Sequence, residues 1–261
     1  MTTIDAGLLN DASRAASGVS GTPPWDWLTP AYVVFTRSVL SLAPDYPCYL
    51  GARGQLDGNN SFAALDERAD GAVAQLARSL VTFRRRAWTG PKRQSLIVFV
   101  GPPQPPADLD AEFARFWDLL AALHRYDPAP WPVDMPTDPR DPAWQWCFAG
   151  EPWFTFMCSP AYRARRSRNV GPCLTLVFQT RRVFDGLSGT SVAGQAAKAR
   201  IRKRLHAYDA VPPHPHLGDG TSSTRHKWRQ YALPDDQAEL ALDACPWPGA
   251  SPGTTTVAGR R

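Results

Sequence analysis

Residues 141–185 read DPAWQWCFAGEPWFTFMCSPAYRARRSRNVGPCLTLVFQTRRVFD and combine the patterns that decide the fold. Two short segments rich in aromatic residues, 144–148 and 153–158, are typical of β-strands. A third strand is predicted for the apolar run 173–179. The connection before that run is basic and holds four arginines, at positions 163, 165, 166 and 168. The stretch therefore predicts β-strands that flank a cationic loop.

Outside this stretch, periodicity predicts helices over 31–42, about 60–86, about 108–124 and 192–208. The first helix is expected to stop at Ala43-Pro44, because a residue before proline disfavours the α conformation. Asn60 or Ser61 would cap the second helix. Strands are expected at the segment that begins with Cys48 and at the continuous apolar run 95–100.

Because helices and strands are interspersed without strict alternation, we expect an α+β (mixed α/β) fold. It would be a single domain with a central sheet, flanked by helices and by long Pro-rich loops. The chain has 261 residues and 26 prolines, which suits this architecture. The domain is expected over 23–245, with mobile segments at 1–22 and 246–261.

Charge and cysteine usage exclude few functions. Lys and Arg number 29 against 24 Asp and Glu, so the net charge of +5 indicates nucleic acid only weakly. The five cysteines are an odd number without a regular framework. No secretory signal opens the chain, and no apolar run of about 18 residues occurs. We therefore expect a soluble, cytoplasmic protein with reduced cysteines and no membrane segment.

Three residues are candidate ligands of a metal or of haem iron. Cys48, in the motif Y-P-C-Y-L-G, could present a thiolate, although a buried structural cysteine has the same pattern. His124 lies on an apolar helix face with Asp127 three residues on; a core histidine would look alike. His214, in P-P-H-P-H, could reach a metal together with His216, but no third ligand follows to make a zinc site.

Glu151 is flanked by apolar residues in F-A-G-E-P, so its carboxylate must be paired, protonated or bound to a cationic ligand. A guanidinium would match it bidentately, and a salt bridge to a nearby arginine is an equal alternative. The arginines could clamp carboxylates or phosphates, or form a solvated surface. The aromatic residues lie in apolar strand patterns, which argues against stacking on exposed bases.

Eight motifs, in order along the chain, resemble those of the YqcI/YcgG family. They are Y-P-C (46–48), L-H-x-x-D (123–127), P-W-P (130–132), P-T-D-P-x-D-P (136–142), C-F-A-G-E-P (147–152), R-R-S-R-N-x-G-x-C (165–173), P-P-H-P-x-L-G (212–218) and W-x-Q-Y-x-L-P-D-D (228–236). Single motifs are weak evidence, whereas the ordered set is specific. It covers most of the chain, from about Trp27 to Asp236.

The resemblance implies a haem b monooxygenase that N-hydroxylates a guanidino nitrogen, with arginine or another guanidino compound as the small-molecule substrate. O2 or peroxide would be the oxidant. A protein that supplies electrons and a second copy of the chain, in a homodimer, are further expected partners. Cys48, His124 and His214 all fall in matching motifs. We rank Cys48 first as the iron ligand, because a thiolate favours O–O cleavage.

Chemistry suggests roles for the remaining candidates. Arg165, Arg166 and Arg168 would pair with haem propionates or the substrate carboxylate, and Glu151 would take the guanidinium. Trp144, Trp146 and Trp153 would form the walls of the pocket. The alternatives are a haem enzyme that oxidises another amine, a protein that handles haem without catalysis and, from a different class, a basic nucleic-acid-binding module.

Overall fold

The strands expected around the basic loop all form, and they pair with earlier segments in one mixed sheet. The computed structural model describes residues 8–10, 27–101, 108–187, 191–217 and 226–247. Within these residues the strand order is β1-β2-β3-β6-β5-β4. The strands are β1 (Leu8–Asn10), β2 (Ser61–Asp66), β3 (Leu96–Gly101), β4 (Cys147–Phe148), β5 (Glu151–Cys158) and β6 (Thr175–Thr180). Strands β2 and β3 run parallel, and the other neighbours run antiparallel.

The side chains of the central strands alternate between two faces, because successive residues of a strand point to opposite sides. In β3, Leu96 and Val98 join one hydrophobic cluster, whereas Ile97 and Phe99 join another. Every residue of β3 is buried, as expected for a strand covered on both faces.

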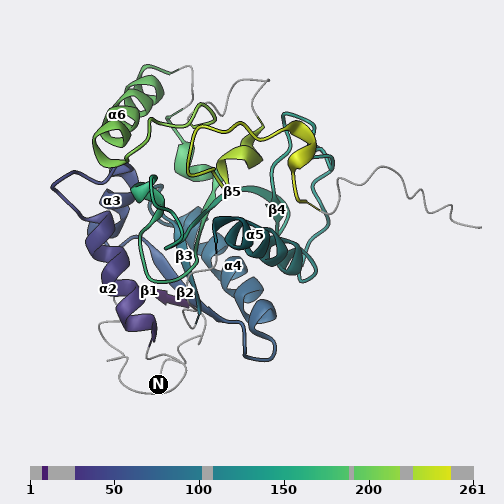
Figure 1. Ribbon diagram of the computed structural model, residues 1–261. Coiled ribbons are helices and arrows are strands. Elements are labelled where there is room, and N and C mark those ends of the chain that lie inside the picture. The colour runs from purple at the N-terminus through teal and green to yellow at the C-terminus, as the bar shows by residue number, and fades with distance from the viewer. Residues whose placement is uncertain (1–7, 11–26, 102–107, 188–190, 218–225, 248–261) are drawn as a thin grey trace, which may run out of the picture.

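One face of the sheet carries the main core. Helices α4 (Ala72–Thr89) and α5 (Leu109–His124) pack on it (Figure 1). Helix α5 begins where expected, since the carboxylate of Asp108 accepts a 2.8 Å hydrogen bond from the N–H of Ala111. The tryptophans of the aromatic run lie in this core.

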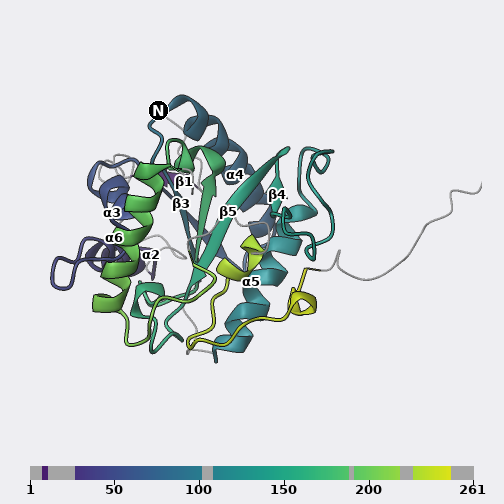
Figure 2. The same ribbon diagram turned by 90° about the horizontal axis from the view of Figure 1, so that it is seen from above.

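The other face is covered by α2 (Leu28–Val39), α3 (Tyr49–Leu56) and α6 (Val192–Tyr208). Figure 2 shows these three helices on one side of the sheet and α4 and α5 on the other. Helix α6 spans the predicted range, and its cap Ser191 accepts a 3.0 Å hydrogen bond from the N–H of Gly194. These layers confirm a single-domain α+β fold.

The expected helix over about 60–86 is wrong in its first part. Residues 61–66 form β2, which pairs in parallel with β3, and only Ala72–Thr89 is helical. Gly71 separates the two elements in the left-handed conformation, at φ 72°. The apolar spacing suited a helix, but burial beside β3 outweighs it, since pairing is a tertiary effect that local periodicity does not contain.

Two further expectations need correction. The segment after Cys48 is the helix α3, and Cys48 is its N-cap. The strand expected at 144–148 is reduced to the two residues of β4 at its C-terminal end, and Ala149 (φ 53°) and Gly150 (φ 78°) then make a tight left-handed turn into β5.

The terminal segments lie largely outside the described residues. Of residues 1–22, the described part is β1; of residues 246–261, it is 246–247. Within the described parts of the chain, no helix is both long and apolar enough to cross a membrane.

Candidate functional site

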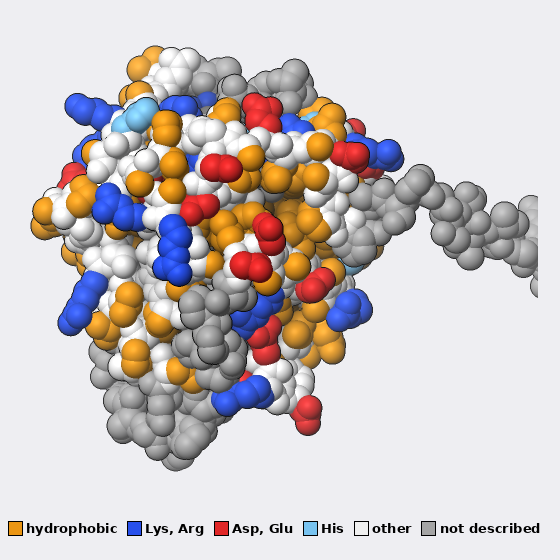
Figure 3. Space-filling view, viewed as in Figure 1, with side chains coloured by type: hydrophobic (Ala, Val, Ile, Leu, Met, Phe, Trp, Pro, Cys, Tyr) orange, Lys and Arg blue, Asp and Glu red, His pale blue; other side chains and the backbone are white. Residues whose placement is uncertain are grey.

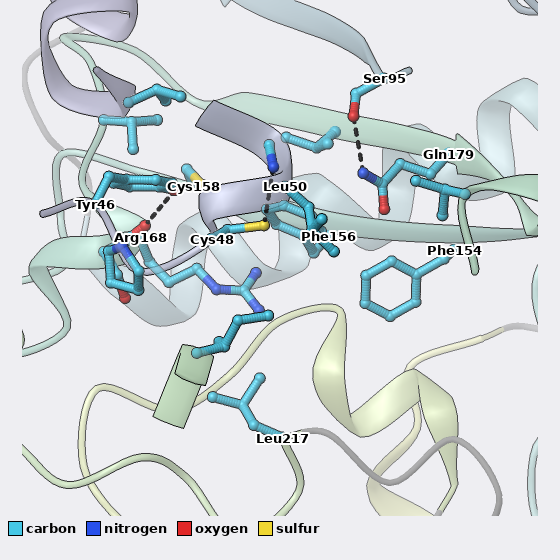
Figure 4. A pocket seen from close by; sticks show the side chains of 18 of the residues that line it. Tyr46, Cys48, Leu50, Ser95, Phe154, Phe156, Cys158, Arg168, Gln179 and Leu217 are labelled. Carbon is cyan, nitrogen blue, oxygen red and sulfur yellow. Dashed lines mark hydrogen bonds between the residues drawn. The ribbon is translucent and has the colours of Figure 1, made fainter. Parts of the chain in front are cut away.

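A cavity of about 270 Å³ lies between the second face of the sheet and helices α2, α3 and α6 (Figure 4). Most of its wall is apolar, with phenyl rings from Phe35 and Phe156 and aliphatic side chains from Ile97, Val177 and Leu205. Sites of this kind, apolar with a few placed polar groups, are typical for small molecules and cofactors.

Cys48 places its thiol in this wall, at the N-terminus of α3. Its Sγ accepts a 3.4 Å hydrogen bond from the N–H of Gly51 (Figure 4). Burial raises the pKa of Cys48, while the N–H groups of Gly51 and Leu50 and the charge of Arg168 act in the opposite direction. The sulfur is therefore protonated in the free protein, in surroundings that already carry donors for a thiolate.

Helix α6 holds the segment that presents Cys48. Arg204 donates a 3.1 Å hydrogen bond to the carbonyl of Tyr46 and a 2.6 Å hydrogen bond to the carboxylate of Asp45. Arg200 lies over the ring of Tyr49, 4.5 Å from its centroid. These contacts flank Cys48 on both sides and fix where its side chain points.

Arg168 reaches the cavity from the basic loop and is buried. Its guanidinium donates to the carbonyls of Met157 (3.0 Å) and Gln230 (3.1 Å) and lies 4.4 Å from the ring centroid of Phe156. Because these partners are neutral, the positive charge of Arg168 is not cancelled by an ion pair within the described residues. A buried cation of this kind favours an anionic ligand.

The basic loop is shaped by two aspartates. Asp235 accepts hydrogen bonds from the backbone N–H groups of Arg163 (2.8 Å) and Arg165 (2.7 Å). Asp209 accepts from the N–H of Ser167 at 2.7 Å. The two carboxylates therefore hold the backbone of the loop in place, and the guanidinium groups of the loop bind other partners.

Arg165 and Arg166 differ in position. Arg165 is buried, lines the cavity and donates to the backbone carbonyls of Pro234 and Asp236, and burial lowers its pKa. Arg166 donates to the carbonyl of Tyr208 and lies outside the cavity lining.

The cavity is electropositive. Among the described residues its lining contains no Asp or Glu, and it includes five cationic side chains, of Arg93, Arg165, Arg168, Lys198 and Arg202. A polar patch lies at one end, where Gln179 donates a 2.8 Å hydrogen bond to Ser95 (Figure 4). The lining thus suits a largely apolar molecule with carboxylate groups.

Of the three candidate iron ligands, only Cys48 lines the cavity. His214 is buried elsewhere: its Nε2 lies 3.0 Å from the carbonyl of Ala238, and its Nδ1 accepts from the N–H of His216 at 3.2 Å. Burial lowers the pKa of His214. Both of its ring nitrogens have protein partners.

His124 lies at the end of α5 on the opposite side of the sheet. Its side chain is 39% exposed, with Nδ1 4.0 Å from the carboxylate of Asp127. The ring packs against Trp131 and Trp247, at the edge of the main core. The structure therefore keeps His124 apart from Cys48.

Trp144, Trp146 and Trp153 are fully buried in the main core and are absent from the cavity lining. Strand parity explains this: Trp153 points to the α4 side of the sheet, whereas Phe154 and Phe156 from the same run line the cavity. Buried tryptophans also cannot stack on the bases of a nucleic acid.

Glu151 likewise lies outside the cavity lining. Its carboxylate forms an ion pair with Arg84 and accepts 3.0 Å hydrogen bonds from Nε1 of Trp88. The carboxylate therefore holds the guanidinium of Arg84, a residue of α4, and not that of a ligand. This arrangement is the internal salt bridge given as the alternative for Glu151, although the arginine expected as partner was one nearer in the sequence.

Several cavity residues on β5, β6 and α6 were not predicted from the sequence, among them Phe156, Val177, Gln179 and Arg202. The period of two in β5 and β6 was the available signal, because it separates these side chains from the tryptophan side. No cluster of three or more His, Cys, Asp or Glu side chains that could hold a metal ion occurs in the part of the chain that the structure describes. A porphyrin needs no such cluster, since its own nitrogens hold the iron.

Comparison with known proteins adds a family. The profile described as the YqcI/YcgG family matches residues 35–248. YcgG of Bacillus subtilis (strain 168) is 33% identical over 226 residues, which cover 85% of this chain and 88% of YcgG. YqcI of the same organism is 36% identical over 206 residues, which cover 77% of this chain and 80% of YqcI.

A third relative comes from Streptomyces lavendulae and is named "Putative N(omega)-hydroxy-L-arginine synthase DcsA". It is 32% identical over 210 residues, which cover 78% of each chain. No solved structure matches this chain.

Proposed function

Because the chain belongs to the YqcI/YcgG family, we propose that it is a haem b-dependent monooxygenase that converts L-arginine to Nω-hydroxy-L-arginine. The name of the relative DcsA supports the reaction and the substrate. The product suits the biosynthesis of an antibiotic or another specialised metabolite. The observation that carries the proposal is the thiol of Cys48 in the wall of an apolar, electropositive cavity.

The cavity residues fit the chemistry of haem. Cys48 would supply a sulfur ligand to the iron, and phenyl and aliphatic side chains would form an apolar wall for the macrocycle. The two propionates of haem need cations, which Arg168 and the other basic lining residues supply. At about 270 Å³ the cavity is slightly smaller than a usual ligand site of about 300 Å³ or more, so binding must displace some lining side chains.

The chemistry that haem supplies is activation of O2 or peroxide, and a thiolate ligand favours cleavage of the O–O bond. Cys48 must lose its proton to serve as that ligand, and the N–H of Gly51 is in place to donate to the resulting anion. The apolar walls exclude bulk water and hold the substrate in one orientation.

Arginine would be recognised through its α-carboxylate, because the described lining holds cations and no acid. The same positive field disfavours a protonated guanidinium and so favours the neutral form, whose nitrogen has a lone pair to react. A role for Glu151 in binding the guanidinium would require displacement of Arg84.

Spectroscopy with product analysis tests this function. The purified protein, loaded with hemin, is expected to show a Soret band and a thiolate-type ferrous–CO spectrum. Cys48→Ala should abolish that spectrum, and the control variants His124→Ala and His214→Ala should retain it. If Cys48→Ala keeps the spectrum of the parent protein and one of the histidine variants loses it, that histidine rather than Cys48 is the iron ligand. No Soret band after hemin addition would refute the haem enzyme.

Mass spectrometry should then detect addition of one oxygen atom to L-arginine, with either peroxide or O2 and a reductant. Lysine and guanidinoacetate serve as competing substrates. Oxidation of one of these in preference to arginine would keep the haem chemistry and change the substrate.

A further inference from the structure

Helix α6 has one side in the cavity and the other in solvent. Lys198, Ile201, Arg202 and Leu205 line the cavity, while Ala199, Arg200 and Lys203 are exposed. A helix with its side chains is about 10–12 Å in diameter, so the solvent side of α6 lies within that distance of the cavity wall. No other element needs to intervene between the two.

The solvent side of α6 is both cationic and flat. The 17 residues of the whole helix include five Lys or Arg and no Asp or Glu, and two of these cations, Arg200 and Lys203, are exposed on the solvent side. Neither Arg200 nor Lys203 has an acidic partner within 4.0 Å among the described residues. Exposed alanines on the same helix, such as Ala196 and Ala199, have short side chains that do not project far from the backbone. A partner could therefore approach the helix closely.

Charge is distributed unevenly over the face of the molecule that Figure 3 shows. Lys and Arg side chains are spread over the part that carries α6 and α3, whereas Asp and Glu side chains gather toward the middle of the view. Such an arrangement steers an acidic partner toward α6 and orients it there.

The proposed reaction needs electrons from outside. With O2, one oxygen atom enters the N–H bond of the substrate and the other leaves as water, which takes up two electrons and two protons. The sequence contains no Gly-rich phosphate loop of the kind that binds a nicotinamide or flavin dinucleotide. Where O2 is the oxidant, a separate electron carrier that binds close to the cavity would supply these electrons.

We propose that the outer side of α6 docks a small acidic electron-transfer protein of the iron–sulfur or flavin class. This inference rests on the proposed function, because it assigns the donor for that reaction. Two successive one-electron deliveries by the docked carrier balance the reduction of O2. The basic side of α6 supplies the attraction, and the thickness of one helix sets the distance to the cavity.

The test uses the full-length protein and a plant-type [2Fe–2S] ferredoxin as the probe. Binding is measured by microscale thermophoresis at about 20 mM and about 200 mM salt, since exposed charges are strongly screened in the second condition. Parent affinity is expected to fall by about tenfold between the two conditions. Absence of binding at low salt would overturn the proposal.

Matched variants locate the surface. Ala199→Glu with Lys203→Glu acidifies α6, and Thr82→Glu with Arg85→Glu makes the same charge change on exposed positions of α4, across the sheet. The α6 pair should weaken ferredoxin binding by about tenfold, and the α4 pair by less than about twofold. Equal weakening in both pairs, or none in the α6 pair, would overturn the proposal.

A kinetic readout separates this inference from the proposed function. In hemin-loaded protein under CO, the α6 pair should slow formation of the ferrous–CO band by reduced ferredoxin and leave peroxide-driven turnover unchanged. Unchanged reduction in the α6 pair would overturn docking at this surface. A protein that binds no hemin, yet binds ferredoxin through α6, would refute the haem enzyme alone and keep the docking surface.

Discussion

Cys48 is half-buried and combines two properties. Burial raises its pKa, and yet the N–H of Gly51 and the charge of Arg168 are arranged to stabilise a thiolate. A structural cysteine gains nothing from such donors. A ligand sulfur does, because coordination removes its proton and leaves an anion that needs hydrogen bonds.

The first prediction concerns pH. Since the thiol of Cys48 is protonated below its raised pKa, coordination to haem iron releases a proton, and each unit of pH should raise hemin affinity about tenfold. The rise continues until the pH reaches that pKa. Hemin titrations between about pH 6 and 9 measure it. A neutral histidine ligand would instead give a flat profile above about pH 6.5. Cys48→Ala is the control and should lack the slope.

The second prediction concerns Gly51. A Cβ at this position would lie 3.3 Å from Sγ of Cys48, so Gly51→Ala should push the sulfur out of place. Alanine also favours the helix by about 1 kcal/mol, so the free protein should not lose stability. We expect hemin affinity to fall about fivefold, with an unchanged or higher melting temperature. Leu56→Ala, at an exposed position of the same helix, is the control. Unchanged affinity in Gly51→Ala would show that the contact is irrelevant to the ligand.

At this scale the sequence predicted residue types better than positions. The motif around Cys48 indicated a presented thiolate, and Cys48 does line the cavity. The aromatic run indicated a ring-lined pocket, but Trp153 faces the core while Phe156 faces the cavity. Alternation separates the two sets of residues, but nothing in the sequence says which face of the sheet is hollow.

Among the elements, the basic loop after β5 shows how acids can organise cations without pairing with them. Asp235 binds backbone N–H groups of the loop, so the guanidinium of Arg165 is left to donate to neutral carbonyls. Ordering the loop in this way keeps the positive charge available for a ligand.

The third prediction follows for this loop. Asp235→Ala removes the acceptor of the N–H groups of Arg163, Ala164 and Arg165 and should lower stability by about 2–3 kcal/mol. For a chain of this size the melting temperature should fall by about 4–10 °C. Hemin affinity should fall as well, because the loop positions Arg168.

Asp236→Ala is the matched control, since that carboxylate accepts only from Ala238 within the described residues. Its expected cost is below about 0.5 kcal/mol. Equal melting temperatures for the two alanine variants, measured by calorimetry, would show that Asp235 does not order the loop.

Helices α5 and α6 were predictable because each has a cap and a clear period, as Asp108 and Ser191 show. The first part of the region 60–86 was not, because the apolar residues of β2 fit a helical period by coincidence. Only the pairing with β3, more than 30 residues later, identifies them as a strand. Local patterns contain no information on such distant partners.

Considered as a whole, the molecule uses the two faces of one sheet differently. Phe178 in β6 is fully buried and packs against Trp146, with ring centroids 5.6 Å apart. Phe156, on the neighbouring strand β5, lines the cavity beneath Arg168. The main core and the cavity thus lie on opposite sides of the same strands.

The last prediction compares the two faces through one substitution. Phe178→Leu should lower stability by about 1–2 kcal/mol, because it leaves a void in a close-packed core, and should leave hemin affinity unchanged. Phe156→Leu should cost less than about 1 kcal/mol, since its ring borders an existing cavity. Its hemin affinity should nevertheless fall about tenfold, because the macrocycle loses an aromatic wall and Arg168 loses its cation–π contact. Denaturant unfolding and hemin titration of both variants measure the two quantities. If both substitutions change stability and hemin affinity equally, the faces are not separate, and the cavity beside Cys48 is part of the core rather than a binding site.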